Sequence, residues 1–137
     1  MERRVLLVNL VTALLVVGGV LMLMSWTGPN MDPGMALLGL VLAAMHFAAA
    51  LGTALRRHWG RLLGLVVGWI GVLGMLAVFV PVVAALPAIT SQPLYAGGSW
   101  LGVLLIPGAM LAAYLVIVVV LTRNRSAFDR QLFGQLG

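Results

Sequence analysis

The chain alternates between long apolar runs and short polar segments. Four runs contain no charged residue and have about 20 residues each, the length that an α-helix needs to cross a hydrocarbon core of roughly 30 Å. They cover residues 5–25, 35–55, 62–84 and 99–122. Because a segment in lipid must satisfy its own backbone hydrogen bonds, the pattern predicts four transmembrane helices.

We therefore expect an all-α fold, an integral membrane four-helix bundle formed by residues 1–125. The connection over residues 85–98 is expected to be irregular and uncharged. In residues 126–137, the spacing of Ser126 and Asp129 resembles a capping box. Apolar residues then recur at helical spacing, which predicts a short amphipathic helix on the inner leaflet; a frayed tail and a docking helix for a partner are the alternatives. These apolar residues are Phe128, Leu132, Phe133 and Leu136.

The composition agrees with a membrane protein and excludes several other classes. Hydrophobic residues make up 63% of the chain and charged residues 8%, whereas about a quarter of the residues of a soluble domain are charged. The 137 residues leave no length for a separate soluble module. There is no cysteine, which excludes disulfides, thiolate metal sites and thiol catalysis.

The basic residues predict the orientation. All eight are arginines, and they form three clusters that are separated each time by two apolar runs. The positive-inside rule therefore places both termini in the cytoplasm, with the first run as a retained signal anchor. The expected ligands are anionic lipid headgroups rather than nucleic acid. The arginines are Arg3, Arg4, Arg56, Arg57, Arg61, Arg123, Arg125 and Arg130.

Small residues predict where the helices touch, because they allow two backbones to approach closely in lipid. The third run carries the clearest stripe, which we interpret as a helix-packing interface; an interface with a partner or a second copy is the alternative. The stripe consists of Gly60, Gly64, Gly68 and Gly71. The faces expected in the other runs are Asn9, Thr12 and Gly19; Gly39, Ala43, Ala50 and Thr53; and Ser99, Gly102, Ala109 and Ala113.

Few polar side chains lie within the runs. His46 lies on the small face of the second run, so we expect it to point into the protein, where ionisable residues are candidates for function. If the first two helices are antiparallel neighbours, Thr12 lies near His46 and Asn9 near Thr53. This ladder either joins two helices or forms a ligand or proton site. Tyr114 is a further candidate for that ligand or proton site, since it lies at the same depth, although it is off the small face of its own run.

The residue types and motifs that the sequence lacks limit the possible functions. No Asp, Glu, Lys or Arg lies within a run, and no catalytic triad, metal-ligand cluster or phosphate-binding loop is present. We expect no enzyme activity, no metal and no cofactor. The favoured function is an accessory, assembly or interaction subunit of a larger complex or homo-oligomer. The alternative is a small oligomeric transporter or channel that uses His46 and a kink at Pro107. The excess of Arg, Ala, Gly, Val and Leu is typical of GC-rich bacteria, which favours a bacterial plasma (inner) membrane.

Overall fold

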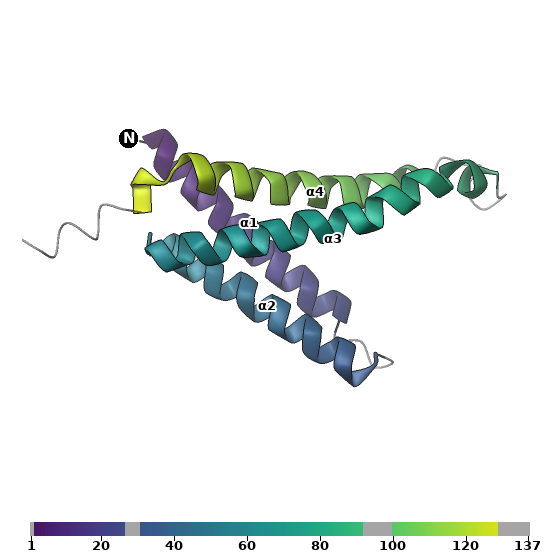
Figure 1. The fold of residues 1–137 in the computed structure, drawn as a ribbon, viewed down its shortest axis with the longest axis horizontal. Coiled ribbons are helices and arrows are strands. Elements are labelled where there is room, and N and C mark those ends of the chain that lie inside the picture. The colour runs from purple at the N-terminus through teal and green to yellow at the C-terminus, as the bar shows by residue number, and fades with distance from the viewer. Residues whose placement is uncertain (1, 27–30, 92–99, 129–137) are drawn as a thin grey trace, which may run out of the picture. The chain divides into compact units, whose positions relative to one another are not determined.

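The computed structural model describes residues 2–26, 31–91 and 100–128. These residues form four long helices, α1 (Glu2–Trp26), α2 (Pro33–Ala54), α3 (His58–Thr90) and α4 (Trp100–Arg123) (Figure 1). Each is long and apolar enough to cross a membrane. The prediction of four apolar spans is therefore confirmed for this part of the chain.

The third helix is longer than predicted. It continues to Thr90 through Pro81 and Pro87, so residues 85–90 are helical and not part of a loop. Each proline removes one backbone donor, which leaves the helical pattern intact on either side. The predicted connection from residue 92 to 98 lies outside the described residues. Of the predicted tail, residues 126–128 are helical, and residues 129–137 with the capping residue Asp129 lie outside the described residues.

The chain divides into two compact units. The first contains Met1–Val67 and Val116–Gly137, and the second contains Gly68–Leu115. The first unit therefore holds α1, α2, the start of α3 and the end of α4. The second unit holds the rest of α3 and α4.

In the first unit, α1 packs along α2, and the two run in opposite directions (Figure 1). The buried residues of each helix recur in steps of three and four, the period at which one face of a helix follows a neighbour. The buried face of α1 is Val8, Val11, Leu15 and Gly18, with the predicted Gly19 beside it. The buried face of α2 is Gly39, Ala43, His46, Ala50 and Thr53, with Ala49 and Gly52 beside it.

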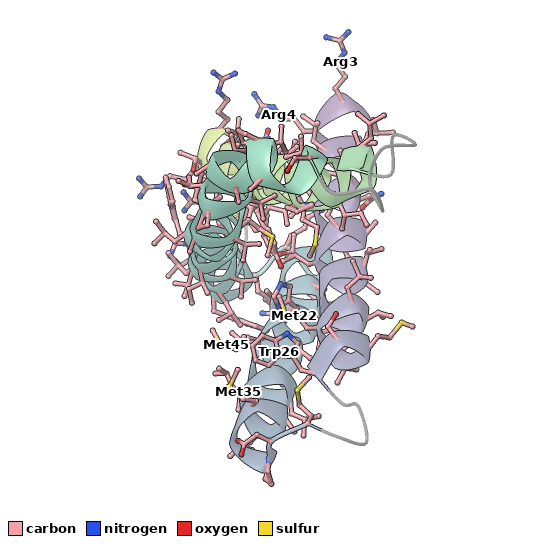
Figure 2. The ribbon with its side chains drawn as sticks, turned by 90° about the vertical axis from the view of Figure 1, so that its right-hand side faces the viewer. Arg3, Arg4, Met22, Trp26, Met35 and Met45 are labelled. Carbon is pink, nitrogen blue, oxygen red and sulfur yellow. The ribbon has the colours of Figure 1, made fainter. Side chains whose placement is uncertain are left out.

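The small residues of α2 lie opposite larger residues of α1. A Cβ on Gly39 would meet the side chain of Trp26, which lies against α2 in Figure 2. Further along the helix pair, the small residue belongs to α1 and the larger residues belong to α2. A Cβ on Gly19 would lie 3.0 Å from the Phe47 ring and 3.2 Å from His46 Cβ. The predicted small face of α2 is thus confirmed as its buried face.

Two local motifs fix the ends of α2. At its start, the Asp32 carboxylate accepts hydrogen bonds from the backbone N–H groups of Gly34 (2.8 Å) and Met35 (3.2 Å), which satisfies donors that lack a helical partner. At its end, Arg57 N donates to Gly52 O (2.9 Å) and Arg56 N donates to Thr53 O (3.0 Å). This pair of bonds is a Schellman motif, and Arg56 occupies its left-handed position with φ 53°.

The close approach of α2 and α3 depends on two glycines in the first unit. A Cβ on Gly60 would meet the backbone of Gly52, and a Cβ on Gly52 would lie 2.5 Å from Gly60 Cα. Backbone atoms cannot move aside as a flexible side chain can. The contact therefore requires glycine on both helices.

The second unit has much less interior. Its buried side chains and glycines are Gly68, Gly71, Val72 and Tyr114, and a Cβ on Gly71 would meet the Tyr114 ring. Beyond this point, none of the described side chains of residues 73–88 and 101–113 is buried. This unit leaves most of its apolar surface uncovered by the described chain.

Candidate functional site

His46 lies in the buried face of α2 with 3% of its surface exposed, as the sequence predicts. Its Nδ1 lies 2.7 Å from the carbonyl oxygen of Leu42, one turn earlier in the same helix. A carbonyl oxygen only accepts, so Nδ1 carries the proton. In the neutral ring Nε2 is then the acceptor nitrogen.

The predicted polar ladder between α1 and α2 is not formed as expected. The Thr12 hydroxyl donates to Val8 O (3.0 Å) in its own helix, so its proton is not available to His46. Asn9 is exposed, whereas Thr53 is fully buried and its hydroxyl has no hydrogen-bond partner. The Asn9–Thr53 bond is therefore absent. The reason is the face of α1: the apolar Val8, not the adjacent Asn9, packs inward.

Tyr114 is buried in the second unit, where its ring covers Gly71. It fills the space that the missing glycine side chain leaves between α3 and α4. The predicted small face of α4 is not the buried one, since Ala109 is exposed and Ala113 is only half-buried; Ser99 and the burial of Gly102 are not described. The buried face of α4 and the residues after it consists instead of Tyr114, Ile117, Leu121, Asn124 and Phe128.

The glycine stripe of α3 packs against the protein's own helices. Gly60 contacts Gly52 of α2, and Gly71 contacts Tyr114 of α4. A Cβ on Gly64 would lie 2.7 Å from Leu121 Cδ1. Gly68 is buried as well. At least three of the four glycines therefore have an intramolecular role that does not require a second copy.

Arg61 differs from the other arginines. It was expected at the lipid headgroups, but only 9% of its surface is exposed. Its Nε donates to the carbonyl oxygen of Leu121 (2.9 Å) in the last turn of α4. Carbonyl groups there lack helical donors and form the negative end of the helix dipole, so they stabilise a cation.

The other described arginines are exposed in the first unit. Arg4 donates from Nη1 to the Ser126 hydroxyl (3.2 Å), which joins the start of α1 to the segment after α4. Figure 2 shows Arg3 and Arg4 at the end of α1 opposite Trp26. The exposed set is Arg3, Arg4, Arg56, Arg57, Arg123 and Arg125. Arg130 lies outside the described residues.

Phe128 is a residue whose role the sequence did not reveal. The sequence predicts it on the apolar face of an amphipathic tail helix, yet it is 1% exposed in the first unit. Two short turns bring it there, with Ala127 N donating to Asn124 O and Phe128 N to Arg125 O (both 3.0 Å). The spacing of Ile117, Leu121, Asn124 and Phe128 continues the buried face past the helix end, and this signal was available in the sequence.

Within the described residues, no group of three or more His, Cys, Asp or Glu side chains could hold a metal ion. Comparison with protein-family models, curated proteins and solved structures finds no match to this chain. The chemistry that this arrangement offers is close helix packing and a concentrated positive charge at one end of the first unit.

Proposed function

We propose that this chain is a non-enzymatic accessory or assembly subunit of a bacterial inner-membrane complex, with both termini in the cytoplasm. The observation that carries the proposal is the exposed apolar surface of the second unit. The described side chains of residues 73–88 and 101–113 include no buried one. In the first unit, by contrast, each helix has a continuous buried face.

In lipid, the hydrophobic effect does not drive helices together, because the lipid tails are as apolar as the side chains. A defined arrangement of helices therefore depends on close packing. A helix pair with so little interior is therefore better held by a further membrane protein than by lipid alone. Gly74 illustrates this, because a Cβ there would meet nothing within 4 Å. Such a surface can accept another helix at close range.

Site-specific photocrosslinking in native membranes tests the proposal. A photoreactive residue at Ile106, which is exposed in the second unit, is expected to capture a protein partner. The matched control is Val17, which is exposed on α1 in the first unit and should yield lipid adducts. Lipid adducts at both positions, together with a lone monomer on purification, would contradict an accessory role.

Capture of a second copy at Ile106 would instead favour the oligomeric transporter or channel. In that case proton and solute flux would be measured in vesicles with the wild type and with His46→Leu. A homo-oligomer that shows no flux would leave the assembly role in place. Flux that His46→Leu abolishes would replace it.

The topology has its own test, for which the absence of cysteine is useful. Single cysteines would be introduced at the exposed positions Ser91 and Ser126. A membrane-impermeant maleimide should label Ser91→Cys in intact spheroplasts and Ser126→Cys only after lysis. The opposite pattern would overturn the orientation.

A further inference from the structure

We infer that one end of the first unit is a binding surface for the phosphate of anionic phospholipids, centred on Arg56 and Arg57. The inference rests on the proposed insertion of the chain in a membrane. It goes beyond that proposal by separating the arginines into one that holds the protein together and others that hold lipid.

Two hydrogen bonds bring the three arginine clusters to the same end. Arg61 joins the second cluster to α4 through Leu121 O, two residues before Arg123. The bond from Arg4 to Ser126 joins the first cluster to the third, one residue after Arg125. The guanidinium groups of these clusters therefore gather where the chain enters and leaves its apolar spans.

The conformation of Arg56 indicates that its charge has a use. It occupies the left-handed position of a Schellman motif, which most often holds glycine because a Cβ is unfavourable there. Its side chain is exposed and therefore contributes nothing to the interior that would offset this cost. Backbone outliers of this kind are associated with functional sites.

The exposed arginines outnumber the acidic residues that could pair with them. The whole chain contains three acidic residues, and one of them, Asp32, caps the start of α2. Only Glu2 and Asp129 are close in sequence to an arginine cluster. Six described arginines are nevertheless exposed in the first unit, so mutual repulsion favours the binding of anions from outside the chain.

The apolar spans determine which anion reaches this surface. Val5 follows Arg4 directly, and the apolar face of α3 begins within a few residues of Arg57. Guanidinium groups in this position lie at the depth of lipid phosphates. Guanidinium also binds phosphate with two parallel hydrogen bonds, so a phosphodiester headgroup matches both the charge and the depth.

The test measures lipid binding to the purified full chain in an uncharged detergent. Native mass spectrometry would compare phosphatidylglycerol with phosphatidylcholine, and a separate thermal-unfolding series would use inorganic phosphate. We expect phosphatidylglycerol to bind and to raise Tm, with no effect from inorganic phosphate at the same concentration. Each arginine near an anionic surface contributes about fivefold in affinity, so Arg56→Gln with Arg57→Gln should weaken binding roughly 25-fold.

Three further variants separate lipid binding from folding. Arg56→Lys keeps the charge and should retain most of the affinity. Arg56→Gly should raise Tm without lipid, because it relieves the backbone, and should still lose affinity for phosphatidylglycerol. Ser91→Asp lowers the net charge by the same amount as Arg56→Gln at an exposed position of the second unit, and should bind lipid normally.

Wild-type affinity in the double variant would overturn the inference, as would equal binding of phosphatidylcholine or a full effect of inorganic phosphate. A loss of affinity in Ser91→Asp equal to that in Arg56→Gln would also overturn it, because net charge alone would then explain binding. None of these results bears on the capture of a partner at Ile106. Failure of this inference and failure of the proposed function are therefore distinguishable.

Discussion

The two parts of α3 contain similar residues in different surroundings. In residues 58–72, small residues recur at Gly60, Gly64, Gly68 and Gly71 and are buried. In residues 73–88, small residues recur at Gly74, Ala77, Ala84 and Ala88, with Pro81 between them, and all are exposed. A stripe of small residues therefore permits close packing of a helix, but it does not determine whether another helix packs there.

The difference lies in what each part of the helix meets. In the first part, the glycines receive the Gly52 backbone and the side chains of Leu121 and Tyr114. In the second part, a Cβ on Gly74 would meet nothing within 4 Å, and a Cβ on Gly108 of α4 would only touch Phe79 at 3.7 Å. Substitutions in two matched pairs, one member in each unit, therefore measure how far the packing extends, and two further tests probe the first unit.

The largest difference is expected between two phenylalanines. Phe128→Ala removes a fully buried ring and should lower the free energy of unfolding by about 4 kcal/mol. Phe79→Ala removes a half-buried ring and should cost about 1 kcal/mol. Equilibrium unfolding in mixed micelles, followed by tryptophan fluorescence, measures both; equal costs would contradict the difference between the units.

The next difference is expected between two glycines of α3. Gly60→Ala places a Cβ against the backbone of Gly52 and should destabilise the protein by about 3 kcal/mol, because the helices must separate. Gly74→Ala has open space around it and should stabilise the helix by about 0.5 kcal/mol. A destabilising Gly74→Ala in native membranes, but not in detergent, would show that a partner helix lies there.

A smaller change in the free energy of unfolding is expected at Arg61. Arg61→Gln removes the charged donor to Leu121 O and should cost about 2 kcal/mol, the usual range for a hydrogen bond to a charged group. The control Arg57→Gln changes an exposed arginine and should leave unfolding in uncharged detergent unchanged. If the two variants unfold alike, the Leu121 contact does not contribute to stability.

The smallest expected effect on the free energy of unfolding is a stabilisation. Thr53→Val replaces a buried hydroxyl that has no partner with a methyl group of similar size, so it should stabilise the protein by about 1 kcal/mol. A polar ladder between α1 and α2 predicts the opposite sign. Unfolding of this single variant in mixed micelles therefore distinguishes the two arrangements.

Much of the fold follows from the sequence, because runs without charge leave helices as the only structure that lipid permits. The buried face of α2 also follows, since its small residues at Gly39, Ala43 and Ala50 form one stripe. The face of α1 does not follow from Asn9 and Thr12, because the buried residues are the apolar Val8 and Leu15, which recur at helical spacing. The Val8 carbonyl of the same helix accepts the hydrogen bond of Thr12 instead.

The site was harder to predict than the helices. The sequence cannot distinguish Arg61 from its neighbours, because the difference depends on Leu121, sixty residues away. The sequence does not predict the left-handed conformation of Arg56 either, since glycine usually occupies that position. The bundle's conformation at these points is decided by tertiary contacts rather than by local pattern.

The bond between Arg61 and Leu121 also affects how the protein is made. A nascent chain that contains α1, α2 and the start of α3 presents the Arg61 guanidinium without its acceptor, since Leu121 has not yet been synthesised. This end of the first unit can therefore close only when the final turn of α4 has been made. A chain that ends before that turn would hold the Arg61 guanidinium without this acceptor.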